Sequence, residues 1–237
     1  DAVRDSGRVV LTSGKATSGR AGSIELTAGR SGAGVGGDVN MLAGAGKESG
    51  GNMHVVSGAG KLSSGELEMR TGDASLKSGA VSLVTGAAML SSGSITVGTG
   101  NSMSGFAGNA SLVAGNGALG GGSINVRAGG VAGSSSSKGG ALDLASGKSE
   151  SGSGGDVALV TGSSATTGNS GNIDVRTGDA RHAKGASGHV LVSTGAASDG
   201  AAGTVLLQGG ASIADGGAIH VKAGDSKGTK GRGGDVT

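Results

Sequence analysis

Few residues of this chain could carry chemistry, and they are scattered. The chain has no cysteine and four histidines, which are His54, His182, His189 and His220. No two of these histidines have the i, i+2 or i, i+4 spacing of a metal-ligand pair. The segments 32–37 and 115–120 match G-x-G-x-x-G, but a dinucleotide site needs a helix after that turn, and no part of the sequence has helical periodicity. We therefore expect no enzymatic activity, no cofactor and no metal.

Candidate residues for contact with sugars, or for their attachment, are easier to find. Three repeats carry a basic side chain two residues before a glycine and could contact an anionic polysaccharide, through Arg127, Arg176 and Lys222. Asn109 begins the tripeptide Asn-Ala-Ser, which is an N-glycosylation acceptor. A run of serines is a candidate for O-glycosylation and comprises Ser134, Ser135, Ser136 and Ser137.

The overall composition excludes several classes of partner. Lys and Arg number 19 against 17 Asp and Glu, which leaves a net charge of +2 and no strongly charged tail. The chain has no tryptophan or tyrosine and one phenylalanine, so it lacks the aromatic side chains on which nucleic-acid bases stack. No apolar run approaches the roughly 20 residues that cross a bilayer. We expect neither nucleic-acid binding nor a membrane span.

The elements that position these residues come from one repeated unit, G-x-Φ-x-Φ-x-s-G, in which Φ is aliphatic and s is small. It recurs along the whole chain at intervals of 14 to 18 residues. Of the 48 Val, Leu, Ile and Met residues, 30 occupy the two Φ positions, a regularity that excludes a low-complexity linker. The opening glycines are Gly7, Gly22, Gly37, Gly51, Gly65, Gly79, Gly93, Gly108, Gly122, Gly140, Gly155, Gly171, Gly188, Gly203, Gly217 and Gly234.

Each unit has the pattern of a short strand. The two Φ positions and the small position lie at i, i+2 and i+4, the period of a strand with one buried face, and residues such as Glu68 lie between them. We expect the closing glycine to take a positive φ, and the Gly- and Ser-rich connections to form turns. Val55, Val97 and Leu144 should then share a dry interior. If they prove as exposed as Glu68, that interior does not exist, and the single-chain rod and its mechanical purpose are both lost with it.

Stacked coils explain why every connection resembles every other. The sequence therefore predicts an all-β fold, a β-solenoid or parallel β-helix of about 15 short strands in a single repeat domain over residues 1–237. Three strands per coil are favoured because hydroxyl side chains close every third unit, and a coil of two strands is the alternative. The last unit, 234–237, lacks its second Φ. We therefore expect a segment of a longer repetitive chain or a unit that stacks end to end.

Four units in particular have a familiar form: GSIELTAG, GSITVGTG, GSINVRAG and GNIDVRTG. They resemble the strand repeats of large secreted β-solenoids, which include filamentous-haemagglutinin-type adhesins and Gly/Ser-rich cell-surface or appendage proteins of microalgae. The resemblance covers the whole chain and implies an extracellular or cell-surface location.

Together these features predict a structural module of an extracellular filament, appendage shaft or cell-surface coat, which supplies stiffness and reach and self-associates or stacks into a filament. The alternative is a binding module, either an adhesin or glycan-binding solenoid or an ice-binding one. Ice binding needs a regular array of outward threonines, and the outward threonines here are interrupted by other residue types.

Overall fold

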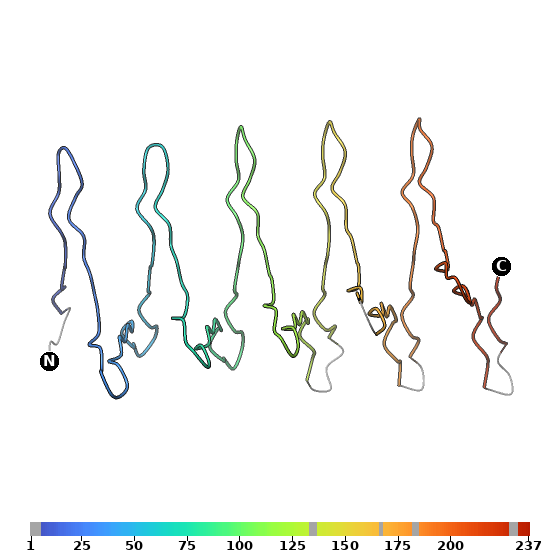
Figure 1. Ribbon diagram of the computed structural model, residues 1–237, viewed down its shortest axis with the longest axis horizontal. Coiled ribbons are helices and arrows are strands. Elements are labelled where there is room, and N and C mark those ends of the chain that lie inside the picture. The colour runs from blue at the N-terminus through green and yellow to red at the C-terminus, as the bar shows by residue number, and fades with distance from the viewer. Residues whose placement is uncertain (1–5, 133–136, 166–167, 182–184, 228–231) are drawn as a thin grey trace. The chain divides into compact units, whose positions relative to one another are not determined.

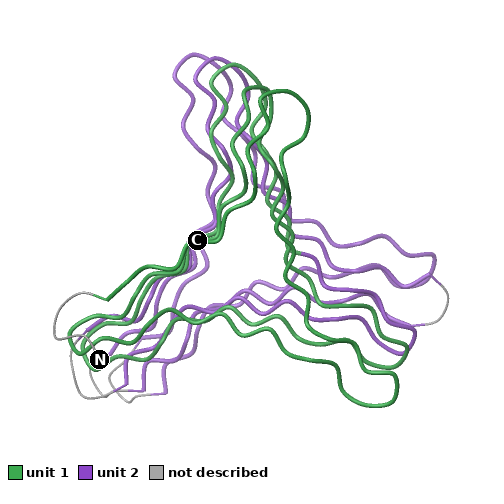
Figure 2. Cartoon of the chain, turned by 90° about the vertical axis from the view of Figure 1, so that its left-hand side faces the viewer, with its two compact units in different colours: residues 1–112 green, residues 113–237 purple. Residues whose placement is uncertain are grey.

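The computed structural model describes residues 6–132, 137–165, 168–181, 185–227 and 232–237 (Figure 1). Within these ranges the chain has no α-helix and no β-strand, and it consists of extended spans joined by loops and bends. It divides into two units, Asp1–Leu112 and Val113–Thr237 (Figure 2). The predicted all-β solenoid is therefore wrong for this chain.

The reason is the lack of a pairing partner for each span. A strand needs a second extended segment about 4.8 Å away whose N–H and C=O groups bond with its own. The backbone–backbone hydrogen bonds among the described residues join only the two glycines at the ends of a loop. A span, meaning the residues from an opening glycine to its closing glycine, thus leaves its internal backbone groups to water. The period-two pattern correctly indicates an extended conformation. Within the described chain, however, the extended spans do not pair with one another.

The expected dry interior is also absent from the single chain. Val55, Val97 and Leu144 are 60%, 84% and 74% exposed, and the side chain of Glu68 is 64% exposed. None of the residues that the structure describes is buried. The rod predicted from the core of one chain, and the mechanical purpose that depended on that core, are therefore both excluded for the single chain.

The total surface leads to the same conclusion. It is 24244 Å², whereas a folded chain of 21.8 kDa exposes about 9,300 Å² and an unfolded one about 31,600 Å². Ordering the backbone costs about 1–2 kcal/mol per residue, and burial of apolar surface is the main term that offsets this cost. By these figures one chain alone removes from solvent only about a third of the surface that full folding would bury.

The backbone hydrogen bonds of the described chain lie where each loop closes. The N–H of an opening glycine donates to the carbonyl oxygen of the preceding closing glycine, at 2.9 Å for Gly37 and Gly29 and 2.8 Å for Gly51 and Gly44. A Cβ on Gly37 would lie 3.3 Å from the nitrogen of Gly29 and 3.4 Å from the Cβ of Ala28. A side chain at Gly37 would therefore crowd this close approach. We call the place where the two glycines meet the loop neck.

The small position of the repeat packs into the loop neck. Apart from Ala16, the described residues that are only partly exposed all occupy it: Ala28, Ser57, Thr71, Ala114, Ala128, Thr161, Thr177, Gly209 and Ala223. Where the small residue is Thr71 or Thr85, its methyl carbon lies 3.5 Å or 3.4 Å from the place of a Cβ on the next opening glycine. In those two loops the described glycines do not form the Gly–Gly hydrogen bond. In these two loops a side-chain contact takes the place of the backbone contact, whereas the loop after Thr161 keeps its Gly171–Gly162 hydrogen bond at 3.2 Å.

The closing glycines do not have the conformation that the sequence predicts. Among the described residues a positive φ occurs at Gly19, 92°, and at Gly168, 132°, and both lie inside loops. Closing glycines such as Gly44, Gly58 and Gly86 have nothing within 4 Å of the place of a Cβ. The predicted positive φ is therefore wrong, and neither conformation nor crowding within the chain requires glycine at these positions.

Serine side chains order several of the loops. Ser31 Oγ accepts a hydrogen bond from the N–H of Gly34 at 2.8 Å, and the same S-x-x-G contact recurs at 3.0 Å in 102–105 and 2.9 Å in 149–152. These serines stabilise a turn by bonding to their own backbone, which confirms the prediction for those three connections.

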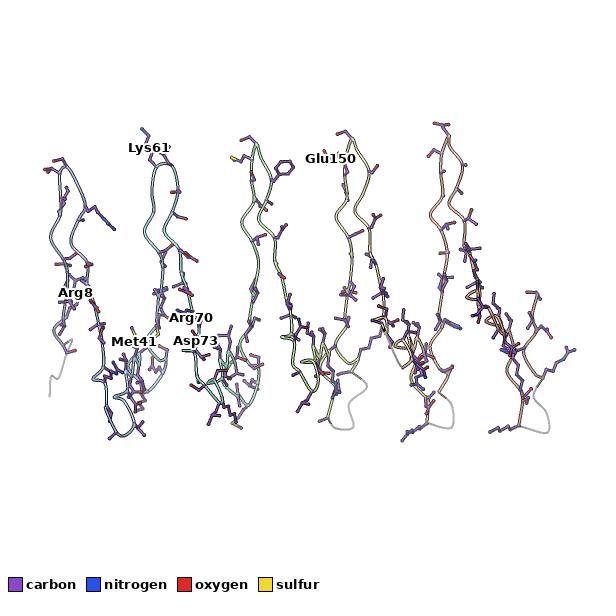
Figure 3. All side chains as sticks on the ribbon, viewed as in Figure 1. Arg8, Met41, Lys61, Arg70, Asp73 and Glu150 are labelled. Carbon is purple, nitrogen blue, oxygen red and sulfur yellow. The ribbon has the colours of Figure 1, made fainter. Side chains whose placement is uncertain are left out.

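Within each unit the loops project in three directions in turn, and the fourth loop returns to the direction of the first (Figure 2). In Asp1–Leu112, Lys61 lies at the tip of one such loop (Figure 3). That loop points the same way as the loops three repeats earlier and three repeats later (Figure 1).

We expect Gly122→Ala to weaken closure of its loop. Gly122 donates the neck hydrogen bond at 2.9 Å, and its Cβ would lie 3.1 Å from the Cβ of Ala114. A cost of about 1 kcal/mol would speed amide hydrogen exchange at the neck roughly fivefold. Gly130→Ala is the matched control because nothing lies within 4 Å of that Cβ. Equal effects of the two substitutions would contradict the role of the neck.

Candidate functional site

The three basic residues predicted to meet an anionic polysaccharide lie on spans of the unit Val113–Thr237. Arg127, Arg176 and Lys222 are all exposed. Each occupies the same place in its repeat, so the repeat geometry presents all three side chains from equivalent positions of a span.

Their electrostatic surroundings differ. Arg176 Nη2 lies 2.5 Å from Asp174 Oδ2, and Lys222 Nζ lies 2.9 Å from Asp225 Oδ2. Arg127 makes no ion pair or hydrogen bond with any described residue. Ion pairs this exposed stabilise a protein by only about 0–1 kcal/mol, but they neutralise the local charge. Of the three cations, Arg127 therefore keeps the least compensated charge.

The predicted modification sites are accessible where the structure describes them. Asn109 is exposed directly after an opening glycine, and Ser137 is exposed in a loop. Ser134, Ser135 and Ser136 lie outside the described residues. Exposure of this kind is what a glycosyltransferase requires, and modification of these residues stays a prediction.

The histidines do not come together. His54, His189 and His220 are exposed, and His182 lies outside the described residues. The described ranges contain no group of three His, Asp or Glu side chains that could hold a metal ion, and no cavity. They also contain no helix of the length and apolar character needed to cross a membrane.

The most extensive functional feature of the described chain is an apolar face. We use this name for the two Φ positions of every span, such as Ile24 and Leu26 in one repeat and Ile95 and Val97 in another. Each of these four side chains is at least half exposed. The apolar face recurs in every complete repeat, and it forms no core within the described chain.

A second set of apolar residues was missed by the sequence reasoning, which placed the intervening positions in water. Five spans carry an aliphatic residue directly before the small position, 80% to 88% exposed: Leu42, Val56, Val84, Val113 and Val160. The sequence signal was the dipeptide of a second Φ followed by another aliphatic residue. The spans are therefore apolar on both sides in these repeats.

Comparison of the chain with protein-family models, with curated proteins and with solved structures finds no match. The extracellular or cell-surface location that the resemblance implies thus stays a prediction, whereas the solenoid fold that it implies is wrong for this chain.

If the basic row contacts an anionic polysaccharide, Arg127 should contribute most. We expect Arg127→Gln to elute from a heparin column at a clearly lower salt concentration than the unmodified chain. Arg176→Gln should shift elution less, because Asp174 already neutralises that guanidinium. Lys61→Gln at a loop tip serves as the control for net charge. Equal shifts for all three variants would contradict a specific role of this row.

Proposed function

We propose that this chain is a structural repeat module of an extracellular filament, appendage shaft or cell-surface coat, and that it acts through self-association. The observation that carries the proposal is the apolar face, exposed in every complete repeat along the described chain. Exposed apolar surface on this scale is characteristic of regions that contact other molecules.

Association is also what a mechanical role would require of this chain. No described residue is buried, so a single chain has no packed interior to resist bending. Packing the apolar faces of several chains against one another would supply the missing interior. Stiffness would then be a property of the assembly.

The loops suit an assembly of this kind. Their tips carry charged residues of both signs, such as Lys61 and Glu150 (Figure 3). The net charge of +2 over 237 residues allows copies to approach without strong repulsion. An extracellular location is supported by the resemblance of the repeats to secreted proteins and by the acceptor sequence at Asn109.

We expect electron microscopy of the purified chain to show elongated particles or filaments of uniform width. Antibodies against the chain should label appendages or the surface coat of the cells that produce it. Particles that stay globular at all concentrations, together with labelling confined to the cell interior, would refute the proposed function. A sample held in strong denaturant is the control for particles formed by drying.

A further inference from the structure

We propose that the partner of the apolar face is this same chain, and that three copies wind alongside one another with each span lying between spans of the other two. The inference rests on the proposed self-association and names its partner, its stoichiometry and its mode. It differs from the single-chain solenoid, because no described span pairs with another span of its own chain.

The constant length of the spans is the first argument for an identical partner. Each complete span keeps eight residues, while the intervals between opening glycines vary from 14 to 18 residues, so the variation lies in the loops. A second copy of the chain offers each span a partner of the same length and the same alternation of aliphatic and polar residues.

The closing glycines are the second argument. Gly44, Gly58, Gly72 and Gly86 have no positive φ, and nothing within the chain approaches the place of their Cβ atoms. Glycine at an open position with ordinary φ is explained when the backbone of another molecule comes close. Copies lying alongside one another would bring a foreign span against each of these positions.

The backbone itself is the third argument. Between its two glycines a described span makes no backbone hydrogen bond. Its N–H and C=O groups are therefore free to form hydrogen bonds with an extended segment at either edge of the span. The two edges of one span can pair with two different copies. Such pairing would remove water from the backbone and from the apolar face in the same step.

The number of copies follows from the directions of the loops. Within each unit the loops project in three directions in turn (Figure 2). Closed assemblies of identical chains are related by rotation, and a third of a turn is the rotation that leaves these directions unchanged. Three copies related in this way place the span of one repeat beside the span of the next repeat in a neighbouring copy.

The surface area is sufficient for such an assembly. One chain exposes 24244 Å², against about 9,300 Å² for a folded chain of this mass. Stable permanent complexes bury about 2,000–5,000 Å² or more. The surplus exceeds that range, so the chain exposes enough surface to be buried against two neighbours.

Sedimentation equilibrium of the full chain tests the stoichiometry. We expect a molar mass three times the 21.8 kDa of one chain. Val55→Asp combined with Val97→Asp should shift the chain to the monomer, because both substitutions place a charge in the apolar face. The matched control is His54→Asp combined with Thr96→Asp. These residues directly precede Val55 and Val97 and lie on the opposite face of the same spans, so this variant should stay trimeric. A monomeric or dimeric unmodified chain would overturn the proposal.

The closing glycines can be tested in the same way. Gly58→Val should dissociate the trimer at least tenfold more readily than Gly200→Val, a change within a loop. Neither glycine has anything within 4 Å of its Cβ position in the single chain. Equal behaviour of the two variants would remove the closing glycines from the interface.

Disulfide formation tests the arrangement of the copies, since the chain has no cysteine of its own. Neighbouring paired spans lie about 4.8 Å apart, within the Cα separation that a disulfide allows. With oxidised glutathione as the oxidant, Val81→Cys combined with Ile95→Cys should give covalent dimers and trimers. Val39→Cys combined with Val81→Cys places the thiols three repeats apart in one chain, and it should cross-link no more than either single variant.

An intramolecular disulfide in the variant with both Val39→Cys and Val81→Cys would show that spans three repeats apart in one chain lie side by side. That result would favour a single-chain solenoid and overturn the proposal. Failure of this inference is separable from failure of the proposed function. A trimer that never forms filaments would refute the structural role alone, and filaments built from monomers would refute the three-copy arrangement alone.

Discussion

The physical constraint that governs this molecule is that an extended backbone with an apolar face is not stable in isolation. Hydrogen bonding along a strand and burial of its aliphatic side chains both require a neighbour. In the described chain the spans have neither, since their backbone bonds are confined to the loop necks and their Φ side chains are at least about half exposed. This lack of neighbours is the basis of our proposal that the chain is one component of a larger structure.

The loop neck shows how much of that component is specified locally. Two glycines approach closely enough to exchange a backbone hydrogen bond, and a small side chain fits beside them. These contacts involve residues no more than a dozen positions apart, so they need no tertiary structure. They fix where each span begins and ends, but a few such contacts cannot offset the conformational entropy of the spans between them.

The sequence allowed the repeat, the span boundaries and the turn-forming loops to be predicted, because each depends on contacts within one unit. Ser31 and Gly34 illustrate this, since the serine stabilises a turn three residues away. The prediction of a single-chain solenoid was wrong, because the sequence does not say which chain covers the apolar face. The alternation of Val55 or Val97 with polar residues indicates only that such a face exists. The three residues predicted to contact sugars differ in their surroundings. Arg176 and Lys222 lie beside carboxylates that neutralise their charges, whereas Arg127 forms no such ion pair with a described residue.

The repeats vary in the length of their loops and not in the length of their spans. The unit from opening to closing glycine keeps eight residues in every complete repeat, whereas the interval between opening glycines varies from 14 to 18 residues. Extra residues are thus accommodated in the loops, which project away and meet few neighbours. An insertion within a span would move every following side chain to the opposite side and displace the apolar face from its partner. A constant span with variable loops is the pattern expected when the spans are what the assembly must match.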